Sequence, residues 1–242
     1  MIVAVLSDIH SNLHALQAVL DSLGTVDAVW HLGDVVGYGP EPDGVVEALE
    51  GAGAIGVRGN HDHAACGKLS LADFNSDARA AAEWTRLRIA PRTREYLEAL
   101  PEKLTPAGTP FTLAHGSPRD PIWEYVFTRD VAAENLTAFQ TPYCLIGHTH
   151  VPLVFRDGRH GIEATAPSPG ASLQLDERRL LINPGSVGQP RDGDPTASYA
   201  VLDTAAGTVT WLRVAYDIEA TQAEMHAAGL PGWLSRRLSF GQ

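Results

Sequence analysis

The chain opens with Met1 to Ser11, MIVAVLSDIHS, which joins an apolar run to two side chains that can bind a metal. Residues 2–6 form a short, unbroken apolar run, which is typical of a strand buried on both faces of its sheet. If the extended conformation persists through Ile9, Asp8 and His10 project to the same side at the carboxyl end of this strand. Ligands bind at that end of open α/β sheets, so the stretch predicts a functional site directly after the first strand.

Composition limits the classes of function. The chain has 242 residues, of which 44% are hydrophobic, and this predicts one large domain over residues 1–242. The formal charge is −11, from 18 Lys and Arg against 29 Asp and Glu, and no basic run is present. This charge argues against a nucleic-acid polymer or an anionic membrane as partner. A small anionic substrate can still bind where metal ions reverse the local field.

Cysteine usage and hydropathy indicate the compartment. Cys66 and Cys144 are too few for a disulfide framework or a thiolate zinc site, so we expect free thiols, with Cys144 buried. The first apolar run is too short for a signal peptide and has no basic residues before it, and no later apolar segment is long enough to cross a bilayer. We therefore expect a cytoplasmic protein. The sequence carries no signal for its oligomeric state.

The next predicted elements place further polar residues at the edge of the sheet where Asp8 and His10 lie. Apolar residues at spacings of three and four predict a helix over 13–23, ended by Gly24, and residues 26–32 predict a second strand. Strand, helix and strand form a right-handed unit, which places Asp34 beside Asp8. A helix over 43–49 and a third strand over 54–57 follow.

The later elements divide into a helical segment and a series of strands. Residues 71–100 predict two helices separated at Pro91, a cap-like segment at about 70–101 lying over or beside the site. The strands 111–114 and 143–146 end in HG and GHTH. Short apolar runs separated by turn residues then predict a largely antiparallel second sheet before a last helix at 218–228. These runs are 152–155, 161–165, 172–175, 179–182, 198–202 and 209–214.

The polar residues at the predicted strand ends form a metal-capable set. They are Asp8, His10, Asp34, Asn60, His61, His115, His148 and His150. Imidazole and carboxylate groups with one amide suit Zn, Mn, Fe, Co or Ni, whereas Ca or Mg favours oxygen ligands. This set is too large for one tetrahedral ion and suits two ions that share a carboxylate, so we expect two divalent metal ions.

The order of these motifs resembles that of the calcineurin-like metallophosphoesterases. The matching motifs are Asp8-Ile-His10, Gly33-Asp34, Gly59-Asn60-His61-Asp62, His115-Gly116 and Gly147-His148-Thr149-His150. The turn at residues 183–188, NPGSVG, is similar to one in small prokaryotic phosphodiesterase-like members. It also has a plain interpretation as a tight connection between sheets. The resemblance implies a four-layer α/β/β/α sandwich of two mixed sheets flanked by helices.

The resemblance also implies roles for single residues. One ion would be held by Asp8, His10, Asp34 and His150. The other would be held by Asp34, Asn60, His115 and His148, with Asp34 bridging. His61 would then donate a proton to the leaving group during in-line attack by a metal-bridging hydroxide, with Asp62 orienting its ring. Two divalent ions would carry four positive charges. The carboxylates of Asp8 and Asp34 would offset two of these and the hydroxide one, which leaves a cationic centre for a phosphate.

One departure from the motifs of the family narrows the range of expected substrates. Its Ser/Thr protein phosphatases continue the second motif as GDxxDRG, whereas Gly37 and Tyr38 stand here in place of the Asp and Arg. The sequence therefore favours a phosphodiester or another small phosphorylated substrate. Phosphomonoesterase, dinucleoside-polyphosphate hydrolase and protein phosphatase activity remain alternatives, as does a non-catalytic metal-binding scaffold.

Several residues are weaker candidates for contact with substrate. Asn12, Tyr38 and Arg58 are expected to line the pocket, together with Asn75. Arg191 could also reach a phosphate, but an arginine in a Gly/Asp loop is more often part of a surface ion pair. The other five histidines match no motif, and we expect structural or surface positions for them.

Overall fold

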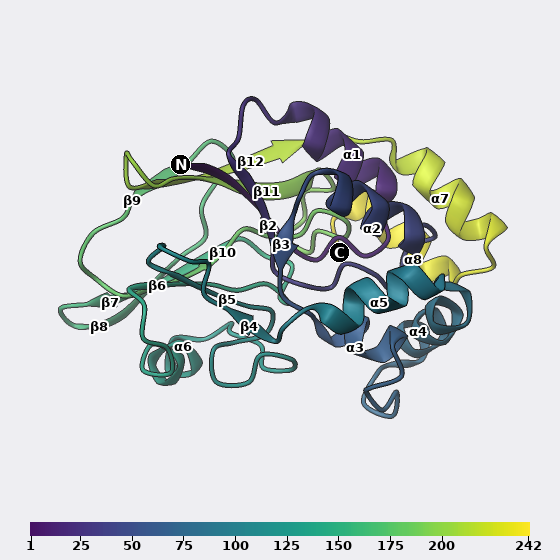
Figure 1. The fold of residues 1–242 in the computed structure, drawn as a ribbon, viewed down its shortest axis with the longest axis horizontal. Coiled ribbons are helices and arrows are strands. Elements are labelled where there is room, and N and C mark those ends of the chain that lie inside the picture. The colour runs from purple at the N-terminus through teal and green to yellow at the C-terminus, as the bar shows by residue number, and fades with distance from the viewer.

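All residues, 1–242, are described by a computed structural model, in which twelve strands and eight α-helices form two packed sheets with helices outside them (Figure 1). The strands are β1 (Ile2–Leu6), β2 (Ala28–His31), β3 (Ile55–Gly56), β4 (Lys103–Leu104), β5 (Phe111–Ala114), β6 (Tyr143–Leu145), β7 (Leu153–Gly158), β8 (Gly161–Thr165), β9 (Ser172–Gln174), β10 (Leu180–Asn183), β11 (Ala197–Asp203) and β12 (Thr208–Val214). The helices are α1 (Leu13–Ser22), α2 (Pro42–Gly51), α3 (Asn60–Ala65), α4 (Ser76–Arg88), α5 (Pro91–Ala99), α6 (Arg129–Asn135), α7 (Ile218–Ala227) and α8 (Gly232–Arg236), followed by a 3₁₀ turn at Arg237–Phe240.

The two sheets have six strands each and are both mixed. The first has the order β3-β2-β1-β11-β12-β9, and the second has the order β4-β5-β6-β10-β7-β8. In the first, β1 runs parallel to β2 and antiparallel to β11. In the second, β6 runs parallel to both β5 and β10. The four-layer α/β/β/α prediction is confirmed.

Strand β1 is buried on both faces, as its unbroken apolar run predicts. Val3 and Val5 belong to the core between the two sheets, whereas Ala4 and Leu6 belong to the core under α1 and α2. Successive side chains of a strand alternate between faces, so one apolar run serves two cores.

The second sheet uses the same alternation. Leu180 and Ile182 of β10 face the first sheet, and Leu181 packs under α6. In β6, Leu145 faces inward and Cys144 lies under α6. The three layers of apolar contact therefore follow from strands whose two faces are both apolar.

The strands of residues 152–214 differ from the expected arrangement. They do not form one antiparallel sheet: β7, β8 and β10 complete the second sheet, whereas β9, β11 and β12 join the first. The pairing of Leu202 with Val3 inserts β11 next to β1, two hundred residues away along the chain. Local alternation identifies a strand but does not specify its partner.

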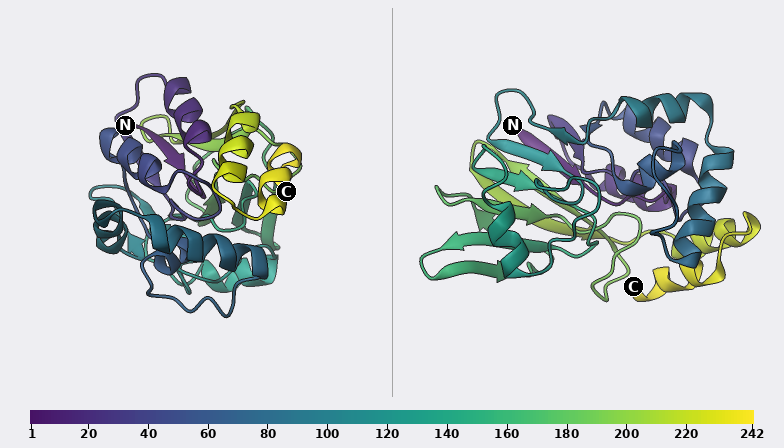
Figure 2. Two further views of the ribbon diagram at one scale, coloured as in Figure 1. Left: turned by 90° about the vertical axis from the view of Figure 1, so that its right-hand side faces the viewer. Right: turned by 90° about the horizontal axis from the view of Figure 1, so that it is seen from below.

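Most helices gather at one end of the sheets, as Figure 2 shows, whereas α6 packs on the second sheet. The expected helical segment contains α4 and α5, separated before Pro91, and α4 starts only at Ser76, where the Asn75 side chain accepts the amide hydrogen of Ala78. Trp84 of α4 donates its indole N–H to the carbonyl of Ala228, which ties this segment to the C-terminal helices. No sequence pattern predicted α3, α6 or α8.

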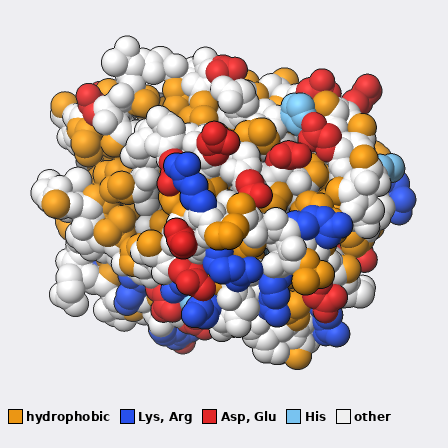
Figure 3. All heavy atoms as spheres, turned by 45° about the vertical axis from the view of Figure 1, so that its right-hand side comes forward, with side chains coloured by type: hydrophobic (Ala, Val, Ile, Leu, Met, Phe, Trp, Pro, Cys, Tyr) orange, Lys and Arg blue, Asp and Glu red, His pale blue; other side chains and the backbone are white.

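The surface carries mixed charge. Acidic and basic side chains are interspersed on the face that Figure 3 shows. The longest helix has 13 residues, and no helix combines the length and apolar character that crossing a membrane requires.

The two thiols are free and buried, and we predict that they are unreactive in the native protein. Burial raises the pKa of Cys66 to about 11 and raises the pKa of Cys144 as well, so little thiolate forms at pH 8. With a chromogenic disulfide reagent at pH 8, we expect negligible rapid labelling of native protein and two thiols per chain in guanidinium chloride. Rapid stoichiometric labelling of the native protein would contradict this packing.

Candidate metal centre

The backbone turns sharply at the ends of β1, β2 and β6. Seven non-glycine residues have φ between 49° and 66°, in the left-handed region that side chains disfavour. They are Asp8, His10, Ser11, Asp34, Tyr38, His148 and His150. Strain of this kind concentrates at functional sites, where the surrounding structure imposes it. The extended conformation of β1 does not persist through Ile9, because the chain leaves it at Asp8.

Four of the predicted ligands form a first buried cluster: Asp8, His10, Asp34 and His150. The Nε2 atoms of His10 and His150 lie 3.1 Å apart. Nε2 of His150 is 3.4 Å from Oδ1 of Asp8, and Nε2 of His10 is 3.6 Å from Oδ2 of Asp34. All four residues are at most 2% exposed.

A second cluster adjoins the first through Asp34. Nε2 of His115 lies 3.3 Å from Oδ2 of Asp34, 3.1 Å from Oδ1 of Asn60 and 3.0 Å from Nδ1 of His148. Asp34 belongs to both groups of potential ligand atoms. The structure thus brings together all seven predicted ligands, with the predicted bridging carboxylate between them.

Hydrogen bonds to the backbone orient three of the imidazoles. Nδ1 of His115 lies 2.9 Å from the Leu32 carbonyl, and Nδ1 of His150 lies 2.6 Å from the Gln189 carbonyl. Nδ1 of His10 lies 3.3 Å from the Val36 carbonyl. A carbonyl only accepts, so each Nδ1 carries a hydrogen, and Nε2 is the ring nitrogen that faces the cluster.

This donor set fits divalent cations. Two imidazole lone pairs 3.1 Å apart cannot satisfy each other by a hydrogen bond, and a shared cation is the group that both can bind. Burial lowers the pKa of His10, His148 and His150 well below the usual value, which favours the neutral form that binds metal.

His115 and Asp34 form an electrostatic pair. Burial alone would lower the pKa of His115, but the charge of Asp34 raises it to about 9. Burial likewise opposes ionisation of Asp34, yet the neighbouring imidazoles, His115 above all, hold the pKa of its carboxyl below the usual range. The carboxylate that joins both clusters is therefore ionised, as a bridging ligand must be.

The turn at residues 183–188 supports the two loops that carry ligands. The Asn183 amide donates to the Gly147 carbonyl at 2.8 Å. The Ser186 hydroxyl donates to the Asp8 carbonyl at 2.8 Å, and the amide of Gly188 donates to the same carbonyl at 3.0 Å. These contacts favour the structural interpretation of this turn.

His61 is the second residue of α3 and faces the metal-capable cluster. Its ring centroid lies 4.9 Å from that of His10 and 4.3 Å from that of Tyr38, and its buried Nδ1 has no hydrogen-bond partner. Asp62 does not orient it as expected. The Asp62 carboxylate instead accepts the amide hydrogens of Val36 and Gly59 and closes the first turn of α3.

A small cavity adjoins the cluster, and the candidate substrate residues divide around it. Its volume is about 80 Å³, and Tyr38 and Arg191 line it together with His61. Arg58 lies outside this cavity, since its guanidinium reaches the Glu98 carbonyl of α5 at 3.5 Å. Asn12 is structural: its Oδ1 accepts the Ala15 amide hydrogen at the start of α1.

The cavity also has an aromatic wall that no sequence pattern predicted. Phe74, Trp123 and Tyr125 line it, and the ring centroids of Phe74 and Trp123 lie 5.2 Å apart. Trp123 and Tyr125 come from the irregular loop between β5 and α6, where no periodicity marked them. Phe74 and Asn75 come from the predicted cap-like segment, so the beginning of that segment borders the cavity.

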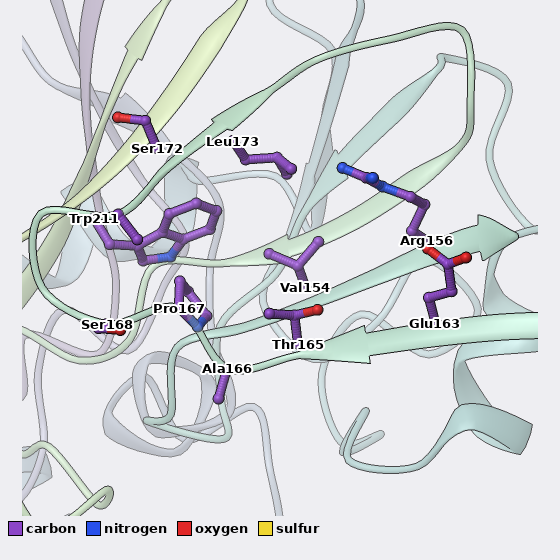
Figure 4. A pocket seen from close by; sticks show the side chains of 11 residues that line it. Val154, Arg156, Glu163, Thr165, Ala166, Pro167, Ser168, Ser172, Leu173 and Trp211 are labelled. Atoms are coloured by element: carbon purple, nitrogen blue, oxygen red, sulfur yellow. The ribbon is translucent and has the colours of Figure 1, made fainter.

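A second cavity, of about 290 Å³, lies between the β7–β8 hairpin and strands β9 and β12 (Figure 4). Trp211 and Pro167 stand at one end of it, and Arg156 and Glu163 at the other. No histidine lines it, so it lacks the donor set of the metal-capable cluster.

Comparison with known proteins agrees with this geometry. Residues 1–207 match the family model described as the calcineurin-like phosphoesterase superfamily domain. The chain belongs to this superfamily. Membership places this phosphoesterase among the metal-dependent phosphoester hydrolases and confirms the resemblance of its motifs.

Individual relatives extend the match beyond residue 207. The phosphoesterase is 47% identical to a metallophosphoesterase from Sphaerobacter thermophilus of known crystal structure, with a TM-score of 0.91 over 100% of this chain and 99% of the other. It is 37% identical over 249 residues to an uncharacterized protein of Methanocaldococcus jannaschii, covering 99% and 98% of the two chains. A hypothetical protein of Pyrococcus horikoshii OT3, 21% identical, shares the fold, with a TM-score of 0.80 over 100% and 98%.

The contact between Gly188 and the loop after β1 generates a prediction. A Cβ at Gly188 would lie 1.8 Å from the carbonyl oxygen of Ile9, so Gly188→Ala must displace the backbone between Asp8 and His10. We expect a loss of about 1–3 kcal/mol in the free energy of unfolding and weaker metal binding. Gly24→Ala is the matched control, since a Cβ there meets nothing within 4 Å. Thermal unfolding and metal titration test both variants, and equal behaviour would contradict the close approach.

Proposed function

We propose that this phosphoesterase hydrolyses a small phosphodiester with two divalent metal ions, held by the two clusters that share Asp34. The single observation that supports this most is the junction of the clusters, in which Asp34 lies 3.6 Å from Nε2 of His10 and 3.3 Å from Nε2 of His115. One carboxylate between two sets of nitrogen and oxygen donors suits a bridging ligand.

The seven donors divide as the family resemblance implies. Asp8, His10 and His150 would bind one ion with Asp34, and Asn60, His115 and His148 would bind the other with it. When bound, the ions would lower the pKa of a water molecule and offset charge on the phosphoryl oxygens. The neutral amide of Asn60 leaves its ion more electrophilic than a third carboxylate would.

His61 is the proposed proton donor to the leaving oxygen. It lines the cavity with Asp34 and Asn60, and its buried Nδ1 is unpartnered. Burial lowers the pKa of His61 to about 4, so the ring is neutral before substrate binds. A phosphate anion beside the ring would raise this pKa again and favour the protonated form.

Arg191 replaces Arg58 as the proposed phosphate contact. Its Nη2 donates to Oε1 of Gln189 at 2.8 Å, its buried Nε has no partner, and the guanidinium lies 5.8 Å from the ring centroid of Tyr38. A guanidinium held in a cavity by a neutral amide and an aromatic ring keeps charge available for an anionic substrate.

Packing around His61 favours a diester over a phosphoprotein. A Cβ at Gly37 would lie 2.5 Å from Nδ1 of His61, so the imidazole occupies the space that the Asp of GDxxDRG would need. Tyr38 stands where the Arg of that motif would contact phosphate. Both groups on which the protein phosphatases depend are therefore replaced here by other contacts.

The hydrolytic proposal predicts metal-dependent turnover of a model diester. The protein loaded with Mn should hydrolyse bis-p-nitrophenyl phosphate, and a chelator should abolish turnover until Mn is restored. Asp34→Asn should remove almost all activity, because a neutral amide cannot replace the negatively charged carboxylate that both ions would share. A protein that is inert toward diester and monoester substrates, and whose metal content Asp34→Asn leaves unchanged, would contradict the proposal.

The role of His61 separates an enzyme from a metal-binding scaffold. His61→Ala should lower kcat by about 10²–10⁴-fold, the usual range for a lost acid–base group, while the bound metal measured by elemental analysis stays constant. His160→Ala, an exposed histidine on the turn between β7 and β8, is the control and should retain full activity. Equal turnover by both variants would exclude the catalytic role of His61, and a substrate panel would distinguish diesters from dinucleoside polyphosphates.

A further inference from the structure

Two exposed aromatic side chains lie next to the cavity, on the loop between β5 and α6. Tyr125 is 44% exposed and Phe127 is 51% exposed, which is unusual for two large aromatic residues so close in the chain. Val126 between them is 1% exposed and packs in the core under α6. The buried valine anchors the loop and leaves both rings outside.

These rings extend the cavity wall outward from a proposed metal ligand. The Tyr125 ring lies 3.8 Å from the His148 ring, centroid to centroid, at an interplanar angle of 23°. The centroid of the Phe127 ring lies 6.0 Å from that of Tyr125 at an interplanar angle of 11°, so these two rings are nearly parallel. Tyr125 also lines the cavity that Asp34, Asn60 and His61 enclose. A group attached to a phosphate in that cavity is therefore within reach of the Tyr125 ring.

The loop is held in place before any ligand binds. Oε2 of Glu124 accepts hydrogen bonds from the Ser117 hydroxyl and the Asn135 amide, both at 2.7 Å, and Glu124 also pairs with Arg119. The amide of Gly116 donates to the Pro121 carbonyl at 2.7 Å. Aromatic surface fixed in this way binds a ligand without the entropic cost of ordering a loop.

We propose that Tyr125 and Phe127 form a stacking shelf for a planar aromatic group esterified to the substrate phosphate, as in a nucleoside phosphate. The proposal rests on the proposed function, because it assumes that phosphate binds at the metal-capable cluster. Aromatic side chains stack on any base, since every base has a π-face, and such contacts contribute strongly to binding. Arg191, which lines the same cavity, would hold the anionic part of the same ligand.

Binding of phosphate monoesters that differ only in their organic group tests the shelf without requiring turnover. Isothermal titration calorimetry on the Mn-loaded full chain carrying His61→Ala compares adenosine 5′-monophosphate with ribose 5-phosphate, and phenyl phosphate with methyl phosphate. We expect the aromatic member of at least one pair to bind about tenfold more tightly, as one stacked ring typically provides. A preference within the first pair alone identifies a nucleobase, and one within the second alone identifies an aryl group close to phosphorus.

Substitutions assign the preference to the shelf. Phe127→Ala should reduce it to about twofold or less while leaving the affinity for ribose 5-phosphate and the bound metal unchanged. Tyr125→Leu should reduce the preference as well, and Tyr125→Phe should restore it. The ring of Phe127 contacts Tyr125 and no metal-capable residue. Phe127→Ala therefore tests the shelf even if Tyr125→Leu also loses metal. Leu87→Ala, on a side chain that is 82% exposed in α4, is the matched control.

The proposal fails if neither aromatic ligand binds better than its aliphatic partner. It also fails if the preference survives both Phe127→Ala and Tyr125→Leu. Failure of the hydrolytic proposal is a separate result, because it appears as absent turnover of every phosphoester by the wild-type chain while the calorimetric comparison still holds.

Discussion

The carboxylate of Asp34 is the group on which the arrangement of the site depends. It is 1% exposed, it lies between both clusters of potential ligands, and its Oδ1 accepts the amide hydrogen of His61 at 2.9 Å. A buried carboxylate is costly unless charge and hydrogen bonds compensate it. Gly59 permits the compensation, since a Cβ there would lie 2.1 Å from Oδ1. The backbone of the GNHD segment thus closes on Asp34, and this contact places both Asn60 and His61.

Sheet topology explains how distant segments reach this carboxylate. The parallel strands β1, β2 and β3 end at one rim of the first sheet, and the parallel strands β5 and β6 end at the facing rim of the second. The loops after β1 and β2 continue to pair beyond the strands, with the amide of His10 donating to the Asp34 carbonyl at 2.9 Å. The connection from β10 to β11 then crosses between the sheets through residues 183–188. Its hydrogen bonds to the Asp8 and Gly147 carbonyls fix the distance between ligands of the two sheets.

The sequence predicts the parts of the structure that depend on local pattern. Strands β5 and β8 have the predicted bounds, and the polar residues after each buried strand meet at one rim because parallel strands align their ends. The partners of β7 to β12 are not local information, so the division of these strands between the sheets was not predicted. The positive φ angles at Asp8 and His10 were not predicted either, because only contacts that form on folding impose them. Arg191 was undervalued for a similar reason, because only the folded structure places it beside Tyr38 in the cavity.

The proposed chemistry and the proposed selectivity therefore rest on different parts of the chain. The metal-capable side chains come from the ends of buried strands, where two apolar cores and the turn at residues 183–188 allow little displacement. The residues that would meet the rest of a substrate, Tyr125, Phe127 and Arg191, come from irregular connections that tolerate change more readily. Tyr125 joins the two parts, since its ring stacks directly on His148. A substitution of this tyrosine would thus alter both the proposed substrate surface and the packing of the His148 imidazole, whereas a substitution of Phe127 would alter the surface alone.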